Sequence, residues 1–319
     1  MMTLRHATKQ APAVTVPHRR DFLTASTGAA AAGVAADALG ADAPPPTAPP
    51  PRTVTLGATG IKTSFLAQGT GVRGSERQSD QTRMGFADFV ALIRHCYDRG
   101  LRFFDLADLY GTHVYFREAL RHFERDQITI LTKLWWPYDG PRDNTNAAHR
   151  AQVTRSALDR FCDELTTDYL DIVLLHCLTD PGWREKMRPY QEALSEAKSN
   201  GQVRVMGVSC HDFGALKAAA ESDWVELILA RTNPEGVKMD AAPAEVNAVL
   251  QAAKDSGKSV VGMKIFGEGK LADDRERCLR YAQSLDYLDA MTIGFHTPAQ
   301  VDDVLRLLRS TEPPPQQPA

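Results

Sequence analysis

The sequence predicts an α/β fold in which eight strand–helix units close into a (β/α)8 barrel, of the TIM-barrel class, with an N-terminal β-hairpin. Two observations lead to this prediction. Short runs of aliphatic and β-branched residues alternate eight times with stretches of helical periodicity, over roughly the 250 residues that such a barrel needs. The apolar runs are nearly continuous, which is typical of parallel strands that are covered on both faces.

The expected strands follow one another at regular intervals along the chain. They span residues 64–70, 101–107, 128–134, 170–176, 203–209, 225–232, 259–265 and 290–295. Helical periodicity fills the segments between them. Gly100, Gly201 and Gly257 suit helix ends, because glycine readily adopts the left-handed backbone found there. Residues 53–63 are expected to form the hairpin, which could plug the bottom of the barrel.

A doubly wound open sheet is the alternative fold. It would carry a glycine-rich fingerprint that opens a helix directly after the first strand. The segment GTGVRG at 69–74 follows the first expected strand but opens no evident helix. The sequence therefore favours the closed barrel, placed at residues 53–310.

The N-terminal segment 1–43 has the order of regions found in an export signal. Early basic residues are followed by the pair Arg19-Arg20, an alanine-rich stretch, and the small-residue sequence Ala41-Asp42-Ala43, which suits a cleavage site. The arginine pair, with Phe22-Leu23 after it, resembles the bacterial twin-arginine signal. We therefore expect the twin-arginine export machinery as a partner and a periplasmic location, with a disordered, alanine-rich tail as the alternative.

Two further segments are expected to lie outside the barrel. Residues 44–52 form a proline-rich linker, because a run of prolines favours an extended chain that cannot pack a core. Residues 311–319, TEPPPQQPA, are expected to be a disordered tail.

Composition excludes several functional classes. The chain has 319 residues, with Lys+Arg 37 against Asp+Glu 40 and a net charge of −3, so it has no electrostatic footprint for nucleic acid. It contains no apolar stretch of the length that a spanning helix requires, so no membrane span is expected in the mature chain. Its five cysteines form no CxxC pair, and an odd number excludes a complete disulfide framework.

The barrel predicts where chemistry should occur, because the active sites of such barrels lie at the carboxyl ends of the strands. Polar side chains at these ends combine a carboxylate, a phenol, a lysine and an imidazole, which together can perform acid–base catalysis. A lysine beside a tyrosine is expected to lower the tyrosine pKa, because a nearby cation favours the phenolate. The candidates are Asp105, Asp108, Tyr110, Lys133, His176, Ser209, Cys210, His211, Arg231, Asn233, Lys264 and His296.

The segments around these residues resemble the aldo-keto reductase family, over roughly residues 53–310. The first segment of the expected barrel and four motifs at strand ends are similar to the corresponding segments of that family. They occur in the same order. They are TVTLGATGIKTSFLAQGT (53–70), FDLADLYG (104–111), LTKLWW (131–136), TDYLDIVLLH (167–176) and VRVMGVS (203–209).

The resemblance implies an oxidoreductase that reduces an aldehyde or ketone, or oxidises the alcohol, with a nicotinamide cofactor. Tyr110 would be the general acid that protonates the carbonyl oxygen of a small-molecule substrate. Lys133 would lower the pKa of Tyr110, and Asp105 would pair with Lys133. His176 would orient the carbonyl group, and Ser209 would bind the carboxamide of the nicotinamide.

The resemblance also implies cofactor contacts from Cys210, Gly294, His296 and Thr297, and a substrate contact from Trp135. Because side chains alternate along a strand, one of Trp135 and Trp136 is expected to face the barrel mouth and the other the helical layer. The resemblance implies that the inward one is Trp135. No metal is expected at the site.

The chain departs from the family pattern in its cofactor contacts. The sixth strand lacks the usual glutamine, although Arg231 ends that strand, and the seventh offers Met263 and Lys264 in place of an aromatic residue. Met263 could make soft apolar contact with the cofactor, and Lys264 and Arg231 could meet its phosphates. The segment after the eighth strand places an acid, Asp303, where a 2′-phosphate would be gripped. The cofactor is therefore NADP or NAD, with NADP favoured by the resemblance alone.

Two other functions are compatible with the sequence. The first is a non-catalytic barrel that binds nicotinamide or another ligand as a sensor or accessory protein. The second is a zinc-dependent hydrolase, because cysteine and histidine at neighbouring strand ends can hold zinc. Its ligands would come from His176, Cys177, Cys210, His211 and His296.

Overall fold

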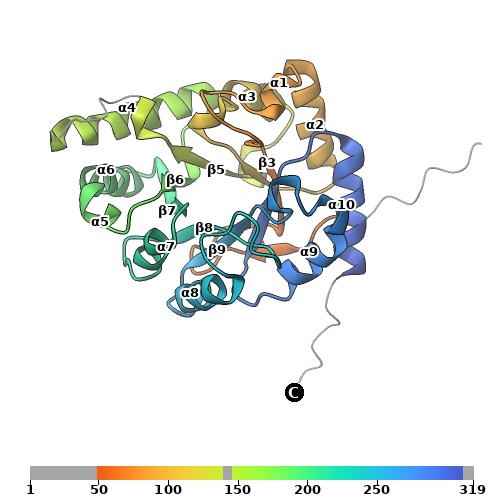
Figure 1. Ribbon diagram of the computed structural model, residues 1–319. Helices are drawn as coiled ribbons and strands as arrows, with labels where there is room; N and C mark the ends of the chain where they lie inside the picture. Colours follow the sequence, from red (N-terminus) through yellow and green to blue (C-terminus); the bar gives the residue numbers. More distant parts are fainter. Residues whose placement is uncertain (1–48, 139–145, 312–319) are drawn as a thin grey trace, which may run out of the picture. The chain divides into compact units, whose positions relative to one another are not determined.

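The computed structural model of the protein describes residues 49–138 and 146–311, and these residues form a closed parallel barrel. Its eight strands lie side by side in chain order, and the last strand pairs with the first to close the ring. Figure 1 shows the helices as an outer layer around these strands. The predicted (β/α)8 barrel is confirmed, and the open-sheet alternative is excluded by the pairing of the first and last strands.

The barrel strands are short, and most of their residues are buried on both faces. Their bounds are β3 (Leu66–Gly69), β4 (Phe103–Asp105), β5 (Thr129–Leu134), β6 (Leu170–Leu178), β7 (Val203–Cys210), β8 (Leu227–Arg231), β9 (Ser259–Met263) and β10 (Ala290–Ile293). Side chains from alternate positions fill the barrel or pack under the helices, because successive strand residues point to opposite faces. On β7, for example, Val205 packs inside the barrel, and Met206 and Val208 pack against the outer layer.

An antiparallel hairpin of β1 (Thr53–Thr55) and β2 (Lys62–Ser64) precedes the barrel. Leu56, at its turn, is fully buried and packs with Phe103 and Leu131 inside the barrel. The adjacent Gly57 has a φ of +47°, and a Cβ placed there would lie 2.8 Å from the backbone nitrogen of Ser259, at the start of β9. The hairpin therefore plugs the amino-terminal end of the barrel, as predicted.

Helices connect the strands on the outside of the barrel. Short helices are α1 (Asp80–Arg83) and α5 (Trp183–Lys186), with single 3-10 turns η1 (Asp108–Tyr110), η2 (Arg125–Gln127), η3 (Trp136–Tyr138), η4 (Gly267–Gly269) and η5 (Ala272–Asp274). Longer helices are α2 (Phe86–Asp98), α3 (His113–Leu120), α4 (Ala147–Leu165), α6 (Arg188–Ser199), α7 (Phe213–Ala220), α8 (Pro243–Asp255), α9 (Arg275–Gln283) and α10 (Pro298–Ser310).

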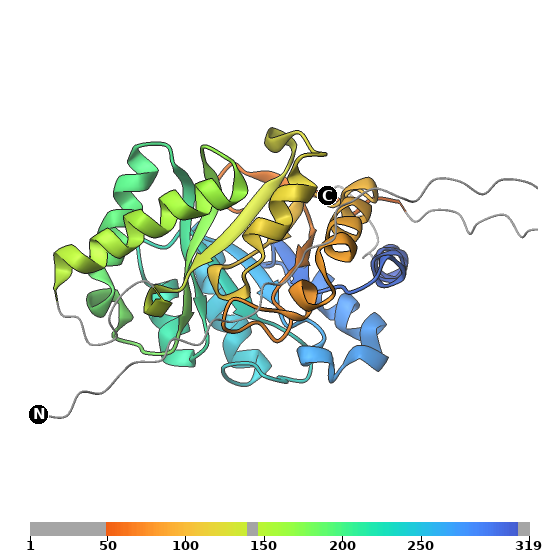
Figure 2. The same ribbon diagram turned by 90° about the horizontal axis from the view of Figure 1, so that it is seen from above.

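Polar side chains begin three of the longer helices. The side chains of Asn146, Asp212 and Thr297 accept hydrogen bonds from backbone N–H groups of the first turns of α4, α7 and α10, which satisfies donors that have no partner within the helix. The longest helix, α4, is yellow-green in Figure 2 and packs between α3 and α6.

The expected export signal, most of the proline-rich linker and almost all of the expected tail lie outside the described residues. The part of the linker that is described packs on the barrel, because Pro50 lies against Gly100. The helices of the described ranges include none that is long and apolar enough to cross a membrane. All five cysteines are free.

Candidate active site

The four residues expected to catalyse the reaction converge at the carboxyl end of the barrel. Asp105 ends β4, Tyr110 lies in the η1 turn that follows, and Lys133 and His176 lie near the ends of β5 and β6. Parallel strands bring these ends to one rim, so residues distant in sequence become neighbours.

Lys133 is fully buried and forms an ion pair with Asp105. Its Nζ also donates a hydrogen bond of 2.9 Å to the backbone carbonyl of Leu106. A buried ammonium without partners would be costly, and these two acceptors offset its loss of water. The ion pair holds the Lys133 ammonium beside Tyr110, with Nζ 4.9 Å from the centroid of the Tyr110 ring.

Tyr110 and His176 meet at the barrel mouth. The Tyr110 hydroxyl lies 3.3 Å from Nε2 of His176, and the two rings are nearly perpendicular, at 83°. His176 is buried, and its Nδ1 has no hydrogen-bond partner among the described residues. The hydroxyl and the imidazole nitrogen thus present two polar groups to one point in space.

The electrostatics of this pair differ in one respect from the prediction. Burial, with the charge of Asp105 as a further cause, raises the pKa of Tyr110 well above its usual value of 10.0. The net shift is therefore opposite to the lowering expected from Lys133, because desolvation and the Asp105 carboxylate outweigh the nearby cation. Burial and the charge of Lys133 lower the pKa of His176 well below 6.5. Both groups are consequently neutral at physiological pH.

Two glycines enclose the Tyr110 ring, and neither was among the predicted site residues. A Cβ placed on Gly71 would lie 2.3 Å from ring carbons of Tyr110, and one on Gly74 would lie 2.4 Å from another. Neither glycine has a left-handed backbone, so the ring itself excludes a larger residue at these positions. The only signal in the sequence is the small-residue run after the first strand.

The two tryptophans after Lys133 lie side by side, with ring centroids 5.6 Å apart, but they differ in their other neighbours. The Trp135 ring lies 5.8 Å from the His176 ring, at the mouth. Trp136 packs against Tyr190 of α6 in the outer layer, with ring centroids 6.0 Å apart. Trp135 is therefore the tryptophan placed to meet a substrate.

On β7, Ser209 and Cys210 point in different directions. Ser209 is buried, and its Oγ accepts a hydrogen bond of 2.9 Å from the backbone N–H of Cys177, next to His176. Cys210 packs in the outer hydrophobic layer. Strand alternation therefore turns the Cys210 side chain away from the mouth, and the cofactor contact expected of Cys210 stays a prediction.

A second polar group lies at the ends of β8 and β9. Arg231 is paired with Asp240 at 2.8 Å, and the Asp240 side chain is 1% exposed. Lys264 is paired with Glu268. Arg231 and Lys264 lower the pKa of His211 to about 3, after the larger effect of burial. Asp240 lies in a loop, where no sequence pattern pointed to it.

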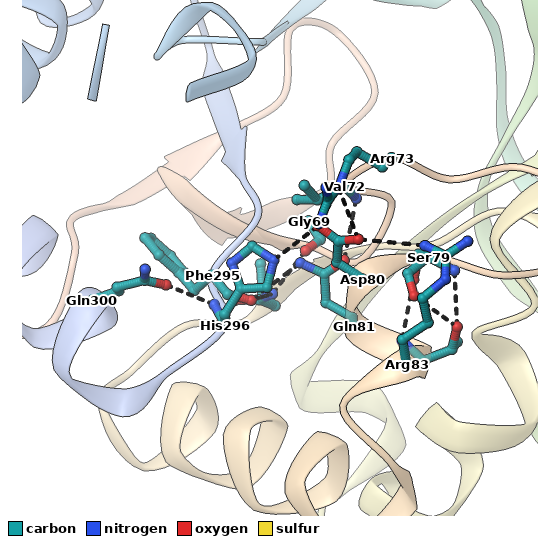
Figure 3. A network of polar contacts seen from close by, with 12 residues as sticks. Gly69, Val72, Arg73, Ser79, Asp80, Gln81, Arg83, Phe295, His296 and Gln300 are labelled. Atoms are coloured by element: carbon teal, nitrogen blue, oxygen red, sulfur yellow. Dashed lines mark hydrogen bonds and ion pairs between the residues drawn. The ribbon is translucent and has the colours of Figure 1, made fainter. Parts of the chain in front are cut away.

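Polar contacts join the segment after β10 to the loop and the short helix α1 that follow β3 (Figure 3). Asp80 forms ion pairs with Arg73 at 2.8 Å, Arg83 at 3.3 Å and His296 at 3.4 Å. Nearby, Gln81 donates a hydrogen bond of 3.2 Å to the backbone carbonyl of Phe295.

The residues expected to bind the cofactor on this side have partners within the protein. His296 contacts Asp80, and the Thr297 side chain caps α10. At Gly294, a Cβ would lie 2.3 Å from Val72, so the two loops are in close contact there. These three residues directly follow β10, at the carboxyl end of the barrel.

The zinc alternative lacks a set of ligands in the part of the chain that the structure describes. No group of three histidine, cysteine or acidic side chains there is placed to hold a metal ion. Cys177 contacts His211, with Sγ 3.6 Å from Nε2, but Cys210 faces the outer layer and His296 lies on the opposite side of the mouth.

Comparison with solved structures agrees with the observed fold. A solved aldo-keto reductase from Bacillus halodurans, in its holo form, superposes with a TM-score of 0.63 at 19% identity, over 82% of this chain and 92% of that protein. A solved aldo/keto reductase from Brucella melitensis gives a TM-score of 0.59 at 18% identity, over 80% and 93% of the two chains. These structures share the fold.

Curated relatives match over shorter lengths. The versiconal hemiacetal acetate reductase of Aspergillus parasiticus is 24% identical over 241 residues, 68% of each chain. The D/L-glyceraldehyde reductase of Hypocrea jecorina is 30% identical over 162 residues, 49% of this chain and 42% of that protein. The match spans only 58% of the length of a Saccharomyces cerevisiae relative and 43% of a Bacillus subtilis oxidoreductase.

The sequence profile of the aldo/keto reductase family matches residues 68–284, which is more than half of the chain and includes Asp105, Tyr110, Lys133 and His176. With the closed barrel and the four side chains at its mouth, this match establishes that the chain belongs to the aldo/keto reductase family.

Proposed function

We propose that the protein is an oxidoreductase that reduces an aldehyde or ketone, or oxidises the corresponding alcohol, with a nicotinamide cofactor. The observation that carries this proposal is the 3.3 Å contact between the Tyr110 hydroxyl and His176 Nε2, beside the buried Lys133–Asp105 pair. Relatives named as reductases of glyceraldehyde and of methylglyoxal support it.

The residues present suit carbonyl reduction. A protonated phenol and a neutral imidazole can both donate a hydrogen bond to one carbonyl oxygen, which polarises the bond to carbon. The hydride that adds to the carbonyl carbon would come from a nicotinamide cofactor held at this mouth. Tyr110 gives its proton to the oxygen, so the product is the alcohol. The phenolate that Tyr110 becomes is stabilised by the Lys133 ammonium, which Asp105 keeps charged.

The mouth also has donors that fit an acceptor-rich cofactor. Arg231 Nε is buried and has no hydrogen-bond partner among the described residues, although another nitrogen of the same guanidinium binds Asp240. Lys264 lies on the neighbouring strand end, and Met263 before it is partly exposed. Arg231 and Lys264 would hold phosphate oxygens, Met263 would contact the nicotinamide ring, and Ser209 would bind its carboxamide.

Replacement of Tyr110 by Phe tests the proposal. Loss of the general acid should lower the rate of aldehyde reduction by about 10²-fold or more, while binding of NADPH or NADH, followed by nicotinamide fluorescence, should stay near that of the wild type. Reduction by the Phe variant at the parent rate would refute the role of Tyr110.

A barrel that binds nicotinamide without turning it over is the alternative. Two plant relatives are named voltage-gated potassium channel subunits beta, at 30% and 28% identity over 127 residues. Nucleotide binding by the wild type, without oxidation of the nucleotide in the presence of any of a panel of aldehydes, would favour this alternative.

NADP and NAD are distinguished by a titration with each. We expect NADPH to bind at least as tightly as NADH, as the family resemblance suggests, and Lys264→Ala to weaken binding of both, because they share the diphosphate that Lys264 would contact. If Lys264→Ala binds both nucleotides as tightly as the wild type, Lys264 does not contact the cofactor.

We also propose that residues 1–43 direct export to the periplasm by the twin-arginine route. This rests on Arg19-Arg20 and the alanine-rich stretch after them. Replacement of both arginines by lysine should leave the precursor in the cytoplasm. Equal periplasmic amounts of the two forms would contradict the proposal.

A further inference from the structure

A network of charged side chains lies behind the turn that carries Tyr110. Asp108, two residues before Tyr110 in η1, is buried and receives two parallel hydrogen bonds of 3.0 Å from the guanidinium of Arg160 on α4. A third contact comes from Arg77, whose Nε lies 3.2 Å from Asp108. A two-pronged arginine–carboxylate contact fixes both distance and orientation.

The same network continues to the strand that carries Lys133. Arg160 also binds Glu164, one turn later on α4, at 3.0 Å. Glu164 contacts Nδ1 of His113 at 2.8 Å, and Nε2 of His113 lies 2.7 Å from the hydroxyl of Thr132. Thr132 directly precedes Lys133 on β5. Polar contacts therefore connect one outer helix to the turn that carries Tyr110, at Asp108, and to the strand that carries Lys133, at Thr132.

Two groups of this network, Glu164 and Arg160, are held in their ionised forms. Burial opposes ionisation of Glu164, but hydrogen bonds from His113 and Arg160 lower its pKa below the usual value. Although burial acts in the opposite direction, Asp108 and Glu164 raise the pKa of Arg160. His113 and Thr132 are both buried, so their contacts exchange little with water.

The turn that carries Tyr110 has little support of its own. It is a single 3-10 turn of three residues and has no capping side chain at its start. Such a turn depends on tertiary contacts for its position. Its carboxylate at Asp108 is the point at which α4 holds it.

We propose that Arg160 and Glu164 are positioning residues for carbonyl reduction. From the outer helix α4 they hold Tyr110 and Lys133 in the relative position that the reaction requires. This inference rests on the proposed function. A displacement of about 1 Å at a reacting group, caused by a change away from the chemistry, can cost about 10²-fold in rate.

The test compares Arg160→Met with a matched control on the same helix. Arg155 forms an exposed ion pair with Glu196 at 2.7 Å, so Arg155→Met removes a similar contact that does not reach the site. For aldehyde reduction with NADPH, Arg160→Met should lower kcat about 10- to 100-fold and leave KM within about 2-fold. Arg155→Met should resemble the wild type, and Arg160→Lys should recover part of the lost rate. All assays are made below the unfolding midpoint of each variant.

A double-mutant comparison separates positioning from general damage. If Arg160 acts through Tyr110, Arg160→Met should have little further effect on the residual rate of Tyr110→Phe. An equal loss in both backgrounds, or an Arg160→Met variant with the wild-type kcat, would overturn the proposal.

A spectroscopic measurement tests positioning without turnover. The ¹⁵N chemical shift of His176 Nε2 should change on Tyr110→Phe in the wild-type background, because the hydroxyl contact is lost. In the Arg160→Met background the change should be small, since the contact is already disturbed. A change of the same size in both backgrounds would overturn positioning by Arg160. If the wild type reduces no aldehyde with either nucleotide, the proposed function fails, and this measurement still decides the proposal about Arg160.

Discussion

The ammonium of Lys133 lies 4.9 Å from the ring centroid of Tyr110, yet the pKa of Tyr110 is raised. Burial outweighs the cation, because Lys133 is already paired with Asp105 and the same carboxylate disfavours a phenolate nearby. The free protein therefore stores a proton on Tyr110, in the state that a general acid requires.

This relationship predicts the titration of Tyr110. In the protein without cofactor, the tyrosinate absorbance of the wild type minus that of Tyr110→Phe should show no ionisation below pH 10.0, the usual pKa of the group. A difference signal that titrates between neutral pH and pH 9 would mean that the charge of Lys133 prevails over burial.

The buried imidazoles predict how stability depends on pH. The pKa of His176 is well below 6.5 and that of His211 is about 3, so the unfolded chain binds more protons than the folded protein once the pH falls below 6.5. Stability should therefore decline as the pH is lowered from 6.5 toward 3. In urea unfolding, His211→Gln should show a shallower decline than the wild type. An equal acid dependence for both proteins would contradict the assignment.

The ion pair of Lys133 predicts a large effect of one substitution. Asp105→Asn leaves the buried ammonium without its counter-charge and should lower the free energy of unfolding by about 3 to 5 kcal/mol. Asp180→Asn is the control, because Asp180 pairs with Lys186 at the surface, and its stability should be close to that of the wild type. Equal urea midpoints for the two variants would show that the buried pair contributes no more than the exposed one.

The glycines around Tyr110 predict a steric effect. Gly71→Ala should lower stability by about 1 to 3 kcal/mol and displace the tyrosine ring, since the added methyl group overlaps it. In a Tyr110→Ala background the same substitution should cost much less, because the obstructing ring is gone. Denaturation of the four proteins of this cycle measures the coupling, and additive effects would place the obstruction elsewhere.

The two tryptophans predict opposite outcomes. Trp135→Ala should change the relative KM values for small and large aldehydes with little loss of stability, because Trp135 faces His176 at the mouth. Trp136→Ala should lower stability by about 3 kcal/mol and leave substrate preference unchanged, because Trp136 packs in the outer layer. The reverse pattern would exchange the two roles.

The sequence alone determined the order of strands and helices, the closed barrel and the rim where polar residues meet. These follow from periodicity and from the rule that parallel strands end at one rim, which place Asp105, Tyr110, Lys133 and His176 among the polar residues of that rim. The family resemblance then singled out these four. The family resemblance, and not alternation along the strand, implied that Trp135 is the tryptophan that faces the mouth.

Only the tertiary structure decided the environment of these residues. The fold decides which groups pack around each residue. It thereby sets the raised pKa of Tyr110, the partner of Arg231, the outward direction of Cys210 and the contact of Gly71 with the Tyr110 ring. Desolvation and ion pairing are set by neighbours that are distant in sequence, as Arg160 is from Asp108. A local sequence pattern does not specify which distant residues these neighbours are.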